Sequence, residues 1–121
     1  MAMNLTMYGY SKCGTCRNAL KWLQANGHQV TMHDLFEHAP SAEVVREWLA
    51  KSGLEIEKLF NTSGELYKEL NLKDRVKAMT VEEKVELLAS HGRLVKRPIV
   101  TDGNRVAVGF KAELFAQAWG L

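Results

Sequence analysis

The order of hydrophobic patterns along the chain predicts an α/β fold built on a mixed four-stranded sheet. Residues 5–10 and 29–34 are rich in β-forming side chains and flank a helical pattern, so they form a βαβ unit whose strands run parallel. Further along, Asp102-Gly103-Asn104 is a turn sequence between two short apolar segments, which predicts an antiparallel hairpin. One parallel pair and one antiparallel pair make the sheet mixed.

Two amphipathic helices are expected in the first half of the chain. The first covers residues 17–26 and ends at Gly27, and the second begins after Ser41, a favourable N-cap residue, and ends at Gly53. Their apolar residues recur at helical spacing. They are Ala19, Trp22 and Leu23 in the first helix and Val44, Val45, Trp48 and Leu49 in the second. We expect Trp48 to pack in the core.

Residues 54–92 are predicted to be mostly helical. Residues 66–70 fit a short turn of helix. Thr80 and Glu83 fit a capping box, in which each side chain binds the backbone N–H of the other residue. The helix that follows is expected to end at Gly92. Its apolar face is expected to consist of Val81, Val85 and Leu88.

The C-terminal region supplies the second half of the sheet. Residues 97–101 fit a strand entered through a proline, and residues 105–108 fit the returning strand of the hairpin. Residues 111–119 then form the last helix. Its expected apolar face consists of Leu114, Phe115 and Ala118.

The composition is that of an ordinary globular domain, with 121 residues, 46% hydrophobic and 25% charged. The longest apolar runs fall far short of the roughly 20 residues that a membrane helix needs. Residues 1–12 lack the basic start and long apolar stretch of a secretory signal. We therefore expect one cytoplasmic domain. Within it, residues 1–34 and 93–121 form the sheet core and residues 41–92 a helical insertion.

The net charge of +2 is small and evenly spread. Residues 1–60 hold 6 basic and 6 acidic side chains, and residues 61–121 hold 10 basic and 8 acidic ones. A protein that binds nucleic acid directly would show a concentrated basic face, so we do not expect that activity. One local basic cluster exists, formed by Arg93, Lys96 and Arg97.

The two cysteines, Cys13 and Cys16, form a single C-x-x-C pair. In a cytoplasmic chain such a pair indicates redox or metal chemistry. Zinc needs four protein ligands, or three and a water, and no second pair at ligand spacing exists among the histidines. These are His28, His33, His38 and His91. We therefore expect no metal site, and we expect the histidines to be exposed or partly buried.

The position of the pair favours the redox interpretation. Cys13 follows a strand and opens a helix, and Cys16 lies about one turn further on. Unpaired N–H groups and the helix dipole stabilise an anion at a helix N-terminus, so the pKa of Cys13 should be lowered. Cys13 would then be the nucleophile and Cys16 the resolving thiol. The alternative is that both are ordinary small apolar residues at a helix start.

These elements, with C-x-x-C at the first strand–helix junction and a proline opening the third strand, resemble the thioredoxin fold. Three motifs, from about Leu5 to Trp119, resemble the arsenate reductase/Spx family. They are Cys13-Gly14-Thr15-Cys16-Arg17-Asn18, Arg97-Pro98-Ile99-Val100 and Val108-Gly109-Phe110-Lys111. The resemblance implies a cis proline at Pro98 and a site with Cys13, Cys16 and Arg97 as catalytic residues. Gly14, Thr15 and Pro98 would be structural residues near it.

The family's arsenate reductases use one catalytic cysteine and bind the oxyanion with three arginines. In this chain Cys16 stands where they have a serine, and Arg97 matches the arginine before the proline. Asn61 aligns with another arginine, and residues 108–110 contain none. Lys111 is the nearest candidate for an additional anion-binding cation, although an ammonium lacks the bidentate fork of an arginine.

The family's Spx regulators share the C-x-x-C pair and bind the C-terminal domain of the RNA polymerase α subunit. A glycine important for that contact follows their second helix, where this chain has Gly53. Uncharacterised arsenate-reductase-like members that carry C-G-T-C are most closely resembled by the segment Phe60-Asn61-Thr62-Ser63-Gly64, together with Tyr67 and Glu69-Leu70-Asn71-Leu72.

The resemblance therefore favours a cytoplasmic dithiol protein, monomeric and without a bound cofactor, that reduces an unidentified substrate. Its electrons would come from glutathione with glutaredoxin, from thioredoxin, or from another small thiol. Two alternatives are open: a true arsenate reductase, and a redox-sensing regulator that binds RNA polymerase. None of the three needs a membrane.

Overall fold

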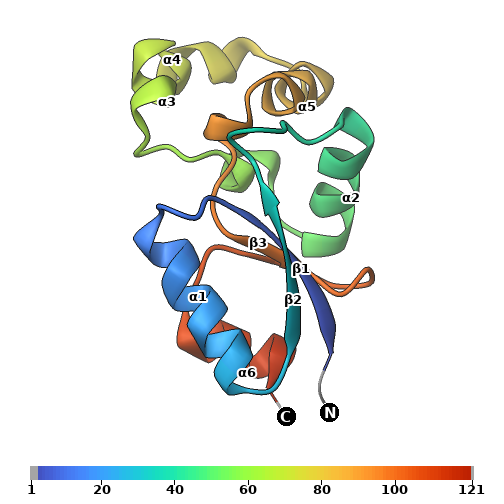
Figure 1. Cartoon of the computed structure of the whole chain (residues 1–121). Coiled ribbons are helices and arrows are strands. Elements are labelled where there is room, and N and C mark those ends of the chain that lie inside the picture. The colour runs from blue at the N-terminus through green and yellow to red at the C-terminus, as the bar shows by residue number, and fades with distance from the viewer. Residues whose placement is uncertain (1–2, 121) are drawn as a thin grey trace. The chain divides into compact units, whose positions relative to one another are not determined.

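The computed structural model describes residues 3–120 of the chain (Figure 1). By its internal contacts the chain divides into two compact units. The sheet unit consists of the chain up to Asp34 and from Arg97 onward, and the helical unit is Leu35–Lys96. No helix in the described part of the chain is long and apolar enough to cross a membrane.

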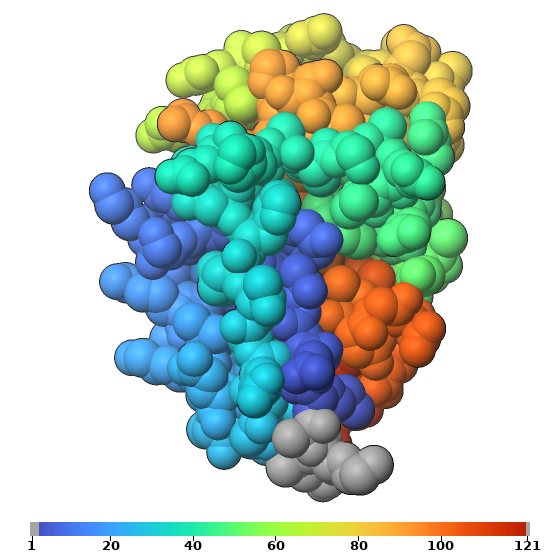
Figure 2. All heavy atoms as spheres, turned by 45° about the vertical axis from the view of Figure 1, so that its right-hand side comes forward, coloured from blue at the N-terminus to red at the C-terminus, as the bar shows by residue number. Residues whose placement is uncertain are grey.

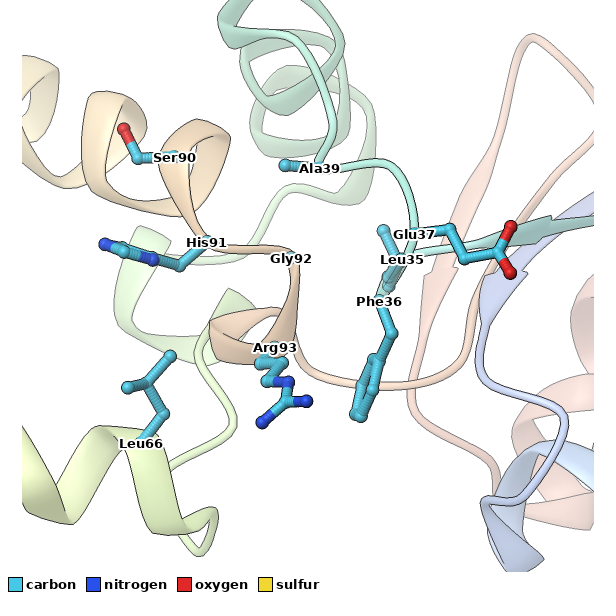
Figure 3. A pocket seen from close by; sticks show the side chains of 9 residues that line it. All are labelled: Leu35, Phe36, Glu37, Ala39, Leu66, Ser90, His91, Gly92 and Arg93. Carbon is cyan, nitrogen blue, oxygen red and sulfur yellow. The ribbon is translucent and has the colours of Figure 1, made fainter.

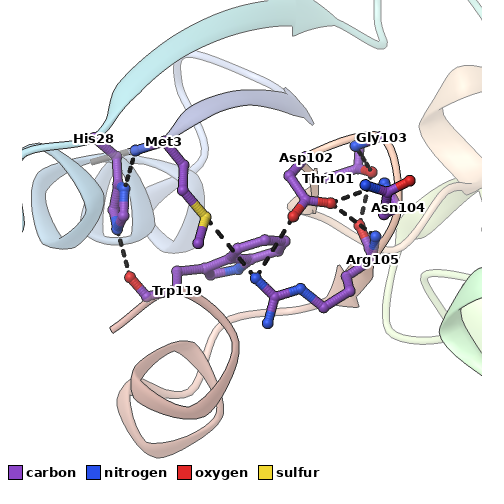
Figure 4. Close-up of polar contacts among 8 residues, drawn as sticks. All are labelled: Met3, His28, Thr101, Asp102, Gly103, Asn104, Arg105 and Trp119. Atoms are coloured by element: carbon purple, nitrogen blue, oxygen red, sulfur yellow. Dashed lines mark hydrogen bonds and ion pairs between the residues drawn. The ribbon is translucent and has the colours of Figure 1, made fainter. Parts of the chain in front are cut away.

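The sheet is mixed and four-stranded, as the sequence predicts. Its strands are β1 (Asn4–Gly9), β2 (Gln29–Asp34), β3 (Ile99–Thr101) and β4 (Val106–Val108). Their order is β2-β1-β3-β4; β1 and β2 run parallel, and β3 is antiparallel to both of its neighbours. The expected hairpin strands are each too long: β3 begins at Ile99 and not at residue 97, since Pro98 has no N–H to donate to the sheet, and β4 begins at Val106 and not at residue 105. The Asp102 carboxylate accepts hydrogen bonds from the N–H groups of Asn104 and Arg105, both at 2.8 Å. These bonds keep Arg105 in the turn (Figure 4).

Two helices, α1 (Gly14–Ala25) and α6 (Ala112–Trp119), cover the same face of this sheet (Figure 1). The core between them and the sheet consists of Leu5, Met7, Ala19, Leu23, Val100, Phe115 and Trp119. The expected apolar face of α6 is partly wrong. Leu114 is 50% exposed, whereas Phe115 and Trp119, one turn apart, both point inward.

Strand β2 forms one edge of the sheet and bonds only to β1. Figure 2 shows β2 at the surface, with α1 on one side of it and β1 on the other. Met32 of β2 is 39% exposed there, although its terminal methyl group reaches back toward Gly9 of β1.

The helical unit contains seven helical segments. They are α2 (Ala42–Ser52), η1 (Ile56–Leu59), α3 (Glu65–Glu69), α4 (Leu72–Arg75), η2 (Val76–Ala78), α5 (Val81–Ser90) and η3 (Gly92–Leu94). The Ser41 hydroxyl caps α2 by accepting from the N–H of Val44, and Gly53 ends it with φ of 69°. Trp48 is buried, and the capping box of Thr80 and Glu83 is present. These four predictions are confirmed.

Two predictions about α5 are wrong. Val81 is 52% exposed, and Lys84 is buried in its place, where its ammonium pairs with the Glu57 carboxylate. The helix ends at Ser90, before Gly92. Gly92 is buried, and a Cβ there would overlap the carbonyl oxygen of Leu35. This glycine is therefore required by a close backbone approach rather than by a helix stop.

His28 does not fit the expectation that the histidines are exposed or partly buried, because only 4% of it is exposed. Its Nδ1 accepts a hydrogen bond from the N–H of Met3 at 3.0 Å, and its Nε2 donates to the carbonyl of Trp119 (Figure 4). The ring must therefore be the neutral Nε2–H tautomer. It joins the start of β1 to the end of α6. The Arg105 guanidinium also lies 5.0 Å from the Trp119 ring centroid.

We expect His28→Ala to lower the free energy of unfolding by about 3 kcal/mol, because it leaves a cavity and deprives the partly buried Met3 N–H and the buried Trp119 carbonyl of their partner. Urea unfolding followed by circular dichroism measures this change. The matched control is His91→Ala, since His91 is exposed, and its effect should stay within about 0.5 kcal/mol. Equal stability of the two variants would contradict the role of His28.

Candidate redox site

Cys13 is the N-cap residue of α1, in an extended conformation with φ of −84° and ψ of 121°. Its N–H donates to the carbonyl of Tyr10, and its own carbonyl accepts from the N–H of Arg17, both at 3.0 Å. The helix therefore begins at Gly14, three residues before the expected start. Cys13 lies at the junction of strand and helix, as the sequence predicts, with its sulfur at the position where capping side chains stabilise a helix.

The pKa of the Cys13 thiol is lowered by its surroundings. Partial burial raises this pKa, but four favourable interactions outweigh it. They come from the backbone N–H and the thiol of Cys16, the charge of Arg97 and the backbone N–H of Thr15. The Cys13 sulfur makes no capping hydrogen bond to the helix backbone. The backbone N–H groups of the first turn of α1 therefore stabilise the Cys13 thiolate largely as dipoles. Cys13 is partly exposed, which leaves this sulfur open to a reaction partner.

Cys16 is the opposite kind of thiol. It is only 1% exposed, and burial raises its pKa to about 11. The N–H of Tyr10 and the charge of Arg97 lower this pKa, while the neighbouring Cys13 raises it further. Both cysteines are free thiols. The site therefore holds one accessible sulfur that favours the thiolate and one buried sulfur that keeps its proton.

Arg97 reaches this pair from the other end of the chain. It is partly buried, its bond to Pro98 is cis, as the family resemblance implies, and its charge acts on both cysteines. Pro98 is buried, and its carbonyl accepts from the N–H of Gly109 at 2.8 Å. This bond fixes the loop on which Arg97 stands.

The remaining predicted residues are spread over the fold. Gly14 and Thr15 form the exposed first turn of α1, next to Cys13. Lys111 is the exposed N-cap residue of α6. Asn61 belongs to the helical unit, where its side-chain oxygen accepts from the Ser63 hydroxyl at 3.2 Å. Asn61 thus shapes a turn of its own loop.

Sequence reasoning missed Gly9 and Tyr10 at the end of β1. Tyr10 supplies an N–H to the Cys16 sulfur, and Gly9 leaves the space that this sulfur occupies. The sequence feature that could have indicated them is a glycine at the end of the first predicted strand, four residues before Cys13.

Arg93 and Arg97, two members of the basic cluster, have different surroundings. Arg93 belongs to the helical unit, where its guanidinium carbon lies 5.0 Å from the centroid of the Phe36 ring. The two side chains line a cavity of about 300 Å³, together with His91, Leu66 and others (Figure 3). Arg97 is the member of the cluster whose charge lowers the pKa of Cys13.

No group of three or more His, Cys, Asp or Glu side chains within residues 3–120 is placed to hold a metal ion.

The fold and the site together define a thioredoxin-fold thiol protein. It has a mixed sheet, a thiol at the N-terminus of the helix after the first strand, a second thiol one turn later, and a cis proline before the third strand. Residues 8–118 match the model of the ArsC family, and the chain belongs to that family. Arsenate reductases and Spx transcriptional regulators are both among its relatives.

Individual relatives cover nearly the whole chain. It is 50% identical over 117 residues to the uncharacterised protein YusI of Bacillus subtilis, covering 97% of this chain and 99% of that one. It is 32% identical over 110 residues to the regulatory protein MgsR of the same organism, covering 91% and 86%. Among solved structures, an ArsC-family-related protein from Bacteroides fragilis superimposes with a TM-score of 0.91 at 42% identity, covering 97% and 98%.

The two thiols should differ in their reaction with iodoacetamide. Cys13 should react first, and its rate should rise as the pH increases through its lowered pKa and then level off, because only the thiolate attacks. Cys16, with a pKa of about 11, should stay largely unlabelled at neutral pH in the folded protein. Mass mapping of quenched samples measures both rates, with urea-unfolded protein as the control in which the rates converge. Faster labelling at Cys16 would reverse the two roles.

Substitution of Arg97 should change the reactivity of Cys13 according to charge. Arg97→Ala should slow alkylation of Cys13 at neutral pH by about fivefold, because the thiolate loses a nearby positive charge. Arg97→Lys keeps that charge and should lose much less. Arg93→Ala is the matched control, and it should leave the pH profile of Cys13 unchanged. Identical profiles for all three variants would show that the helix terminus alone activates the thiol.

Proposed function

We propose that the protein is a dithiol reductase that transfers two electrons from Cys13 and Cys16 to a disulfide or another oxidised substrate. The observation that carries this proposal is the contrast between the two sulfurs. One is partly exposed with a lowered pKa, and the other is buried, protonated and in contact with the first. A structural pair of small apolar residues would not need this contrast.

The reaction on a disulfide substrate proceeds in two exchanges. The Cys13 thiolate attacks one substrate sulfur, the substrate S–S bond breaks, and the first substrate thiolate leaves. The Cys16 thiol then gives up its proton to a departing thiolate and attacks the Cys13 sulfur. The mixed disulfide breaks, a Cys13–Cys16 disulfide forms, and the second substrate sulfur leaves as a thiolate. The dithiol loses two electrons and the Cys16 proton, the substrate gains them, and the proton that the second substrate thiolate takes up comes from water.

The two steps are linked through the charge on Cys13. In the resting site the anionic Cys13 raises the pKa of Cys16, so the buried thiol keeps its proton. Once Cys13 is held in a mixed disulfide its negative charge is gone, while the charge of Arg97, which lowers the pKa of Cys16, remains. Capture of the substrate therefore makes the resolving thiol a better nucleophile.

An external thiol must then return the two electrons to the Cys13–Cys16 disulfide. Glutathione with glutaredoxin, thioredoxin, or another small thiol fits this role, and all of them belong to a reducing cytoplasm. Because the buried Cys16 can be reached only through Cys13, the incoming reductant would also attack at Cys13.

Arsenate reduction is less well supported by this site. Arg97 is the guanidinium that acts on Cys13, and Asn61 is engaged in its own turn. An arsenate assay with glutathione and glutaredoxin belongs in the test as a separate arm, and turnover there would replace the disulfide substrate in our proposal.

A redox-sensing regulator is the second candidate, because a relative of 32% identity is a regulatory protein. Gly53 also lies where the family resemblance places a polymerase contact. It is exposed at the end of α2, in a left-handed conformation, and no atom lies within 4 Å of the position that a Cβ would take. Binding of the RNA polymerase α C-terminal domain that differs between the reduced and oxidised protein would favour this function over turnover.

The experiment that tests the proposed reductase traps its intermediate. Cys16→Ser should form a stable mixed disulfide at Cys13 with oxidised glutathione, visible as a mass increase of one glutathione, whereas the wild type should proceed to the intramolecular disulfide. Cys13→Ser, the matched control, should form neither product at a comparable rate. A wild-type protein that never closes the Cys13–Cys16 disulfide would refute the proposal.

A further inference from the structure

The end of β1 contains a glycine that neither its backbone nor its strand requires. Gly9 is buried and is the last residue of β1, and it is not among the glycines with positive φ. A larger residue would be compatible with that backbone, and glycine in a strand costs stability relative to residues with side chains. The reason for glycine at this position must therefore be the atoms that occupy the space where a Cβ would lie.

That space is occupied by the resolving sulfur. A Cβ on Gly9 would lie 2.9 Å from the Sγ of Cys16, closer than non-bonded carbon and sulfur atoms approach, and 3.5 Å from its Cβ, an ordinary contact. The methyl carbon of Met32 lies 3.8 Å from the same point. The next residue, Tyr10, supplies an N–H to the sulfur. The Cys16 sulfur is thus seated in a recess formed by the end of β1 and the side chain of Met32.

We propose that Gly9 is a positioning residue for the resolving step, and this inference rests on the proposed dithiol function. Without a side chain at residue 9, the Cys16 sulfur sits against β1, within reach of both the Tyr10 N–H and the Cys13 sulfur. A methyl group at residue 9 must displace that sulfur, because the strand and the helix backbone are held by the core. Cys13 keeps the backbone N–H groups of Thr15 and Cys16 and the charge of Arg97, so its activation loses only the contribution of the displaced Cys16 thiol.

Gly9→Ala should therefore separate the two exchanges. With oxidised glutathione, attack by Cys13 and release of the first glutathione should stay near the wild-type rate, because Arg97 and the backbone N–H groups of Thr15 and Cys16 still stabilise the Cys13 thiolate. Attack by Cys16 on the mixed disulfide, with release of the second glutathione, should slow by about tenfold, as expected when a close-packed site is overfilled. The mixed disulfide should accumulate. Acid-quenched samples alkylated with iodoacetamide and weighed by intact mass spectrometry give both rates.

Gly14→Ala is the matched control. Gly14 is also a glycine next to the pair, but no atom lies within 4 Å of the position that its Cβ would take. This variant should show wild-type rates for both exchanges. A slowed second exchange in Gly9→Ala but not in Gly14→Ala supports the inference. If Gly9→Ala closes the disulfide as fast as the wild type, the inference is overturned, while the reductase proposal stands. If the wild type never closes the disulfide, the reductase proposal itself fails.

A double variant keeps the test decisive if Gly9→Ala folds poorly. Cys16→Ala removes Sγ and leaves only the ordinary 3.5 Å contact between the two Cβ positions. Gly9→Ala should therefore lower the midpoint of urea unfolding in the wild-type background and have little effect in the Cys16→Ala background. Equal destabilisation in both backgrounds would show that residue 9 is a glycine for another packing reason, and it would overturn the inference.

Discussion

The direct passage from β1 into α1 is the constraint on which the site depends. The strand ends at Gly9, and Cys13 already caps the helix, so the end of a core strand holds the first turn of α1 in place. A helix N-terminus presents unpaired N–H groups, and a sulfur placed there gains their dipoles without needing a dedicated cation. The same short connection brings Cys16 back over the end of the strand. One backbone geometry therefore exposes the first sulfur and buries the second.

This arrangement could largely be predicted from local sequence, because its causes are local. Gly27 identifies the end of α1, and Cys13 identifies the strand–helix junction, although the expected helix start at residue 17 was three residues late. Ser41 and Thr80 identify the caps of α2 and α5, since each signal acts within one turn of the residue that carries it. The parallel pairing of β1 and β2 also follows from the handedness and shortness of a βαβ connection. The cis bond at Pro98 was different, because it was inferred from family resemblance and not from the residues around it.

The features that sequence reasoning missed depend on contacts between residues distant in the chain. Nothing beside His28 indicates that Met3 and Trp119 will supply its two partners, 25 and 91 residues away. Gly92 resembles a helix stop in sequence, and only the approach of Leu35 shows its other purpose. Leu114 and Val81 recur at helical spacing with other apolar residues, but both side chains are exposed. The spacing shows which residues share a face of the helix, whereas the neighbouring elements determine which face is buried.

Arg97 shows how such a distant contact can contribute to chemistry as well as packing. Arg97 lies in the loop that precedes β3, and its charge acts on both cysteines. A guanidinium stays protonated at physiological pH, so this charge is present in every state of the two cysteines. It therefore favours the thiolate at Cys13 in the resting protein and at Cys16 once Cys13 is covalently occupied. In the proposed reaction, the recess at Gly9 determines where the second sulfur lies, and the loss of negative charge on Cys13 determines when the pKa of Cys16 falls, while Arg97 favours the thiolate throughout. The recess and the guanidinium come from opposite ends of the chain, and both depend on the antiparallel pairing of β1 with β3, which joins those ends in one sheet.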